Sequence, residues 1–171
     1  ILSLGRVGGL HSTIAWGGGL LVILLGTRIE NRSTRQLLAW LAPAALVVAA
    51  GAWWGCMDVG CAWGRETMQP PPLLQWLVTE APDLTHSIRP RYAVRAVGLI
   101  GALATAGLAV VLGPNGGYAL ALYLGLAAGL TFLRGGPMPE VGAKGFAELR
   151  WDALLNGFWA ALVLGSTALS Q

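Results

Sequence analysis

The chain has 171 residues, of which 55% are hydrophobic and 11% charged, with 11 Lys and Arg against 8 Asp and Glu. About a quarter of the residues in a typical soluble domain are charged, so this composition excludes an ordinary soluble protein and predicts an integral membrane protein. The net charge of +3 is small and the basic residues are scattered, which excludes a nucleic-acid-binding surface. No secretory signal pattern follows Ile1, and we expect the natural start to be missing or processed.

Long uncharged runs predict an all-α, polytopic membrane protein with about five transmembrane helices in a single membrane domain, residues 1–171. A spanning helix needs about 20 apolar residues, and the uncharged run over 96–133 is too long for one crossing. Gly113-Pro114-Asn115-Gly116-Gly117 divides this run, because glycine and proline favour a turn. The predicted helices cover approximately 8–27, 36–57, 92–112, 118–133 and 151–170, and a polar loop covers 58–91.

The loop from Arg28 to Arg35 indicates the orientation. It is short and holds three arginines against one acid, which is typical of the cytoplasmic side. The loops on the opposite side carry more Lys and Arg in total, but long connections count for less in this rule. We therefore expect residues 28–35 to be cytoplasmic.

The polar loop over 58–91 is the predicted functional face. Its three consecutive prolines, 70–72, precede an apolar stretch that is too short to span a bilayer, which indicates a rigid entry to an interfacial segment. Trp76 is expected to anchor this segment at the lipid head groups. The loop's polar residues include Arg65, Glu66, Glu80, Asp83, His86, Arg89 and Arg91.

Glycine-rich motifs resemble those of the prolipoprotein diacylglyceryl transferases, bacterial membrane enzymes that move a diacylglyceryl group from phosphatidylglycerol to a lipoprotein cysteine. Gly8-Gly9-Leu10 with Gly17-Gly18 is similar to the family's entrance motif, and Leu41-Ala42-Pro43-Ala44 to the helix before its signature. The signature itself resembles Gly55-Cys56-Met57-Asp58-Val59-Gly60-Cys61-Ala62-Trp63-Gly64-Arg65. The likeness covers roughly 8–134 and implies the C-terminal part of the family's fold, in a bacterial inner membrane.

The family's functional side chains are replaced in this chain. Thr13 stands where the family has its histidine, and Trp53 and Ala127 stand where it has essential arginines. Displacing glycerol phosphate requires arginines that stabilise the phosphate and a base that activates the thiol. The resemblance therefore predicts a scaffold without its catalyst, and it implies a chain that lacks about two of the family's N-terminal helices. An active transferase would need relocated residues, with His11 as base and Arg65 as a replacement arginine.

Five arginines are the predicted contacts for anionic phospholipid. Arg91 and Arg95 lie four apart at the start of the helix predicted over 92–112 and would share one face, either to bind a lipid phosphate or to extend toward the interface. The full predicted set is Arg65, Arg89, Arg91, Arg95 and Arg134.

Cys56 and Cys61 lie five residues apart at a helix end. They would form a disulfide if this end faces an oxidising compartment, bind a metal, or serve as small packing residues. No further cysteine or well-spaced histidine completes a ligand set, so we predict no metal site. No cofactor is predicted other than bound phospholipid.

The leading hypothesis is a catalytically degenerate, lipid-binding or structural subunit of a larger membrane complex, with membrane lipids and other membrane subunits as partners. One alternative is an active phosphatidylglycerol-prolipoprotein diacylglyceryl transferase. The other, a pigment- or quinone-associated subunit of an energy-converting complex, rests on the eight tryptophans and the small-residue packing.

Overall fold

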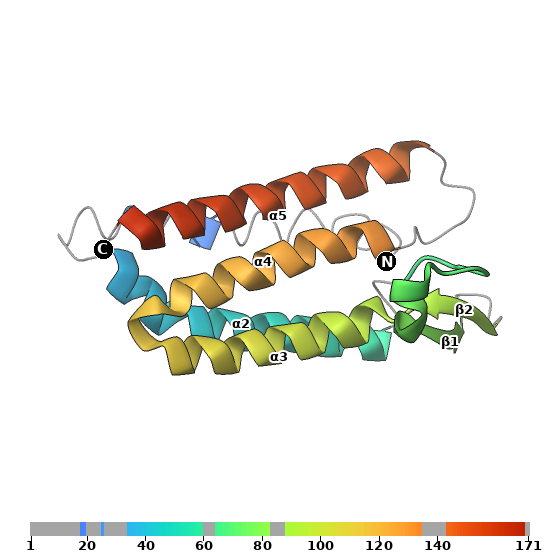
Figure 1. Cartoon of the computed structure of the whole chain (residues 1–171), viewed down its shortest axis with the longest axis horizontal. Coiled ribbons are helices and arrows are strands. Elements are labelled where there is room, and N and C mark those ends of the chain that lie inside the picture. Colours follow the sequence, from blue (N-terminus) through green and yellow to red (C-terminus); the bar gives the residue numbers. More distant parts are fainter. Residues whose placement is uncertain are drawn as a thin grey trace.

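The computed structural model describes residues 18–19, 25, 34–59, 64–82, 88–134 and 143–169. This part of the chain is mostly helical, which confirms the helical class (Figure 1). The elements are α2 (Thr34–Val59), the 3₁₀ helix η1 (Pro72–Leu77), β1 (Val78–Pro82), β2 (Ile88–Tyr92), α3 (Val94–Leu112), the 3₁₀ helix η2 (Gly113–Asn115), α4 (Gly116–Leu133) and α5 (Ala143–Leu169).

The observed bounds of α2, α3 and α4 differ from the predicted ones by at most two residues. The start predicted for α5 is wrong, because the helix begins at Ala143 and not near 151. The charged residues of its first turns indicate a loop, although Ala, Lys, Glu, Leu and Arg are all strong helix formers. The helix predicted over 8–27 lies outside the described residues except for Gly18, Gly19 and Leu25, which are helical, so five spans are not established.

Two stretches, Gln36–Met57 and Val94–Leu133, are long and apolar enough to cross a membrane. Within an 18-residue apolar window of each stretch, only 28% of the residues are buried, whereas the core helix of a soluble protein is mostly buried. The second stretch is 40 residues long and turns at η2, so α3 and α4 form an antiparallel pair (Figure 1). Gly113 has φ +50° there, a backbone conformation that side chains disfavour.

Helix α4 is the centre of the bundle and packs against α2, α3 and α5. Its contact faces are built from alanine, glycine and leucine, which let helix backbones approach closely. At Gly117, for example, an added Cβ would meet the hydroxyl of Thr167 in α5. The largest core cluster includes Leu38, Leu46, Ala102, Ala106, Ala119, Leu120, Leu124 and Val163.

Trp53, in α2, links three helices. Its indole Nε1 donates a hydrogen bond of 2.8 Å to the hydroxyl of Tyr123 in α4. Its ring lies against Gly98 in α3, where an added Cβ would overlap three ring atoms. The half-buried indole therefore fits only because residue 98 is a glycine. It also supplies a hydrogen-bond donor to the Tyr123 hydroxyl, which lies inside an apolar bundle.

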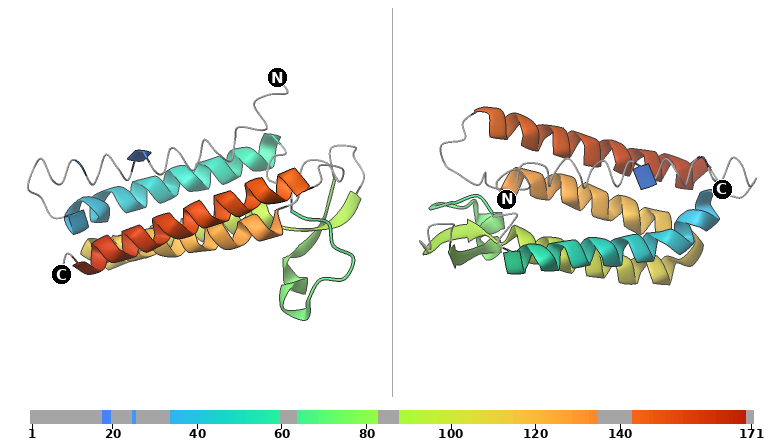
Figure 2. Two further views of the ribbon diagram at one scale, coloured as in Figure 1. Left: turned by 90° about the horizontal axis from the view of Figure 1, so that it is seen from above. Right: turned by 180° about the vertical axis from the view of Figure 1, so that it is seen from behind.

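A β-hairpin corrects the prediction of a polar loop over 58–91 and adds a small sheet to the helical fold. Strands β1 and β2 pair antiparallel, from Val78 opposite Tyr92 to Pro82 opposite Ile88. The sequence analysis missed them because each strand has five residues and contains a proline, which argues against a strand. The stretch expected to be a polar loop thus holds η1 and this hairpin, which extend beyond the helix ends (Figure 2).

Substituting Gly98 by alanine should destabilise the bundle, since the new methyl group would displace the Trp53 indole from its place between the helices. Overpacking of this kind typically costs about 1–3 kcal/mol. Gly107→Ala is the matched control on the same helix, because nothing lies within 4 Å of its would-be Cβ. Thermal unfolding in detergent should show a lower midpoint for G98A and an unchanged or higher one for G107A, and equal midpoints would contradict the assigned role of Trp53.

Candidate functional site

The charged residues of the described chain are unevenly distributed between the two ends of the bundle. The end where α2 finishes, α3 begins and α4 finishes also carries the β-hairpin (Figure 1); we call it the hairpin end. All five arginines predicted to contact lipid are found there. The opposite end, around η2, holds only Arg35 among the charged residues that the structure describes.

The backbone of residues 64–67 connects the bundle to the hairpin. The amide of Arg65 donates to the carbonyl of Leu133 in α4 (2.7 Å), and its own carbonyl accepts from the amide of Tyr92 in β2 (3.2 Å). The Thr67 amide donates to the Pro90 carbonyl (3.0 Å). Gly64 is required for this close approach, because an added Cβ would coincide with the Tyr92 carbonyl.

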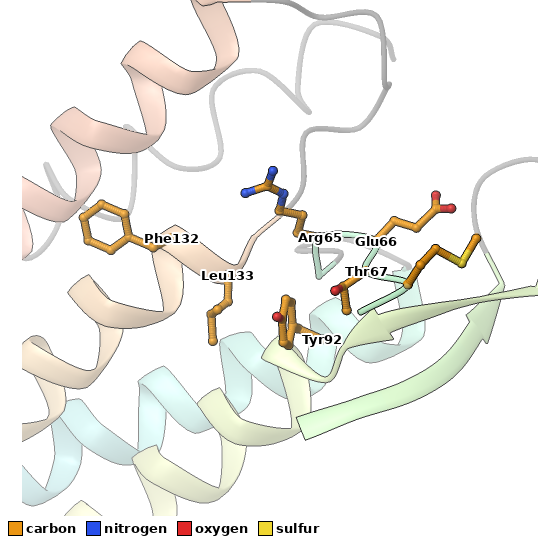
Figure 3. Close-up of a pocket in the computed structure, with 7 residues that line it drawn as sticks. Arg65, Glu66, Thr67, Tyr92, Phe132 and Leu133 are labelled. Atoms are coloured by element: carbon orange, nitrogen blue, oxygen red, sulfur yellow. The ribbon is translucent and has the colours of Figure 1, made fainter. Parts of the chain in front are cut away.

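A pocket of about 350 Å³ lies at this junction (Figure 3). One side is formed by residues 65–68, and the other by the last residues of α4 together with Tyr92. The pocket thus combines one cation and one carboxylate with polar and apolar side chains where the apolar part of α4 ends. Its lining residues are Arg65, Glu66, Thr67, Met68, Tyr92, Phe132 and Leu133.

Glu66 forms ion pairs with two of the predicted lipid-binding arginines. Its carboxylate lies 2.8 Å from Arg89 and 3.7 Å from Arg91. Arg91 also donates to the carbonyl of Gly64 (3.3 Å), so its guanidinium helps to hold the connecting segment on β2. Partly exposed pairs of this kind contribute about 0–1 kcal/mol, so we assign them a positioning role.

Arg65 is placed differently from these two arginines. Its side chain is exposed, and in Figure 3 its guanidinium points away from the Glu66 carboxylate. The salt bridges found among the described residues at this end use Arg89 and Arg91 and not Arg65. Of the five predicted arginines, Arg65 is the one that lines the pocket.

Arg95 stabilises the end of α2. Its guanidinium donates to the carbonyl of Cys56 (3.2 Å), one of the last carbonyls of α2, which have no partner within the helix. A cation there also complements the negative end of the helix dipole. The expectation that Arg91 and Arg95 share a helical face is wrong, because Arg91 belongs to β2 and Arg95 to α3.

Arg134 closes α4. Its amide donates to the carbonyls of Leu130 (3.1 Å) and Thr131 (3.4 Å), and it pairs with Gly64 in an isolated bridge. Its side chain is half-buried. The structure therefore brings the five arginines to one end, where Arg89, Arg91 and Arg95 make side-chain contacts within the chain.

The remaining predicted residues divide between described and undescribed positions. Cys56 is disulfide-bonded, and Cys61, the second of the two cysteines in the sequence, lies outside the described residues, so the pairing stays a prediction. His11 and Thr13 also lie outside them. No group of three metal-ligating side chains is present among the residues that the structure describes.

The sequence does not predict the contacts of two residues, Tyr123 inside the bundle and Phe132 at the pocket. Tyr123 was read as part of an apolar helix, although a phenol there needs a hydrogen-bond partner and this requirement signals an interior contact. Phe132 was missed because nothing in the sequence shows that the end of α4 adjoins Arg65.

Comparisons of the chain with family models, with curated proteins and with solved structures found no match. The transferase resemblance therefore rests on the sequence motifs alone, and function has to be argued from the site.

Proposed function

We propose that the protein is a membrane-embedded, catalytically degenerate relative of the diacylglyceryl transferases that binds anionic phospholipid at its hairpin end. It serves as a lipid-binding or structural subunit of a larger membrane complex. The observation that carries this proposal is the position of Trp53, which fills space between helices where the family resemblance would place a phosphate-binding arginine.

Trp53 makes the interior at the hairpin end unsuitable for transferase chemistry. Its ring packs on Gly98 and its indole N–H is already donated to Tyr123, so it offers no charge to a departing phosphate. Losing a single preorganised donor typically costs about a hundred- to a thousand-fold in rate. Ala127, in the place of the second arginine, supplies no donor either.

The Arg65 pocket suits a lipid head group. A guanidinium binds phosphate oxygens through two parallel N–H donors, and Phe132 and Leu133 provide an apolar wall for the adjoining glycerol and acyl carbons. The pocket adjoins the end of the apolar stretch Val94–Leu133. This is the level at which a phospholipid changes from head group to hydrocarbon.

A membrane location is supported by the apolar surface of the bundle. Val48 on α2, Leu103 on α3 and Phe158 on α5 are all more than half exposed, which is costly in water and favourable in lipid. We propose a bacterial inner membrane with residues 28–35 in the cytoplasm. The disulfide at Cys56 supports this orientation, because disulfides persist in oxidising compartments and the proposal puts the hairpin end on the side opposite the cytoplasm.

Small residues on the bundle surface support the subunit role. Nothing lies within 4 Å of a Cβ built at Gly51, Gly107 or Gly129. Small surface residues let helices of another chain pack closely within a membrane.

Substituting Arg65 by glutamine should weaken binding of phosphatidylglycerol about fivefold, the equivalent of roughly 1 kcal/mol for one arginine at an anionic lipid surface. Native mass spectrometry of the detergent-solubilised protein measures this as the fraction carrying lipid. Arg89→Gln is the matched control and should have a smaller effect, because Arg89 is already paired with Glu66. Equal losses in both variants, or an equal loss of phosphatidylcholine, would argue against the Arg65 pocket.

The chain should fail to rescue cells depleted of their own diacylglyceryl transferase. Growth and lipoprotein modification are the readouts, with the family enzyme as positive control and the membrane level of the chain as the expression control. Rescue that disappears in His11→Ala and Arg65→Ala would restore the active-transferase alternative.

Purification from native membranes in a gentle detergent should retain other membrane proteins at fixed stoichiometry, which mass spectrometry would identify. A monomeric protein that copurifies with nothing would rule out the subunit role and leave lipid binding as the remaining function.

A further inference from the structure

The 3₁₀ helix η1 has two apolar faces. Residues three apart lie on the same side of such a helix, so Leu74 and Leu77 form one face and Leu73 and Trp76 the other. Leu77 is 7% exposed and packs with Tyr92, Val94 and Leu130, and Leu74 packs against the same cluster. This inner face fixes η1 to the ends of α3 and α4.

The outer face of η1 is exposed. Leu73 is 85% and Trp76 77% exposed, values that leave two large apolar side chains almost entirely uncovered. Pro70, Pro71 and Pro72 precede them and restrict the backbone, while the Leu74 amide donates to the Pro71 carbonyl (2.8 Å). The two side chains are thus presented from a short, rigid support.

The indole N–H of Trp76, on this outer face, has a hydrogen-bond acceptor within the protein and needs no water. The indole Nε1 of Trp76 donates to the carbonyl of Leu73 (2.7 Å), and η1 contains no charged residue. An indole whose N–H is already bonded enters a lipid interface without losing a hydrogen bond to water.

A backbone contact sets the height of η1 along the bundle. The amide of Ala93 donates to the carbonyl of Leu77 (2.7 Å), and Ala93 directly precedes the apolar stretch that begins at Val94. The end of η1 is therefore level with the first turn of α3. Figure 2 shows the segment that carries η1 extending to one side of the helix ends rather than over the bundle.

We infer that η1 is an interfacial anchor, with Leu73 and Trp76 inserted at the head-group boundary of the same bilayer that holds the bundle. This inference rests on the membrane location in the proposed function. A lipid surface is favoured over a protein partner because the backbone contact holds the pair level with the start of an apolar helix, where tryptophan is preferred. Residues 65–68 lead directly into this segment, so the anchor also keeps the Arg65 pocket at head-group level.

Spin-label accessibility in lipid nanodiscs tests the anchor on the full chain. Nitroxides are attached at Leu73→Cys and, as a second outer-face position, Trp76→Cys, and the chain without an added cysteine gives the background. Glu80→Cys, at an exposed position of β1, is the aqueous control, and Leu103→Cys, on an exposed position of α3, is the control within the bilayer.

Labels at 73 and 76 should collide more often with oxygen, which concentrates in lipid, than with a water-soluble nickel chelate, as should the label at 103, whereas the label at 80 should show the reverse. Preference for nickel at 73 and 76, with oxygen preferred at 103, overturns the anchor and leaves the membrane location intact. Immobilised labels with low access to both reagents also overturn it, since they indicate protein contact. Preference for nickel at 103 overturns the membrane location itself.

Discussion

The contact of Trp53 with Gly98 and Tyr123 is the constraint on which the hairpin end depends. It joins α2, α3 and α4 at one level, and the ring also packs against the second apolar cluster, which contains Leu77 and Tyr92. The cluster that holds the β-hairpin and η1 therefore packs against the same indole that contacts Gly98 and Tyr123 inside the bundle. A bulky apolar side chain at this place has a structural advantage over a charged one, because it needs neither a counter-ion nor buried water.

Arginines at the hairpin end show how a fold uses cations beside an apolar region. A guanidinium there must be paired, hydrogen-bonded or exposed to water. Arg91 and Arg95 meet this requirement with backbone carbonyls and Glu66, so they are fixed parts of the structure. Arg65 is exposed and lines the pocket, where a ligand can reach it. The nearby partner, which is Glu66 for Arg91 and the end of α2 for Arg95, separates the structural arginines from the candidate binding residue.

Helices α2, α3 and α4 were predictable because an uncharged run of about 20 residues is typical of a membrane-spanning helix. The turn at Gly113 was predictable because glycine and proline favour turns. The hairpin was not predictable, since Pro82 and Pro90 oppose a strand assignment and the pairing depends on contacts with residues 64–67. The sequence also suggested the group of five arginines. It did not separate their roles, because these depend on the approach of Glu66 and of the end of α2, which only the folded chain brings into place.

The lengths of the helices have a consequence for the membrane itself. Helices α3 and α4 have 19 and 18 residues, which corresponds to about 27–28 Å at 1.5 Å per residue, and the apolar part of α5, Ala153–Ala168, is shorter still. A typical hydrocarbon core is about 30 Å thick. If the bundle lies in a bilayer as proposed above, these helices match a thin hydrocarbon core. A thicker bilayer would have to become thinner around α3 and α4. The longer α2 has room to tilt, so the bundle would favour regions of lower bilayer thickness.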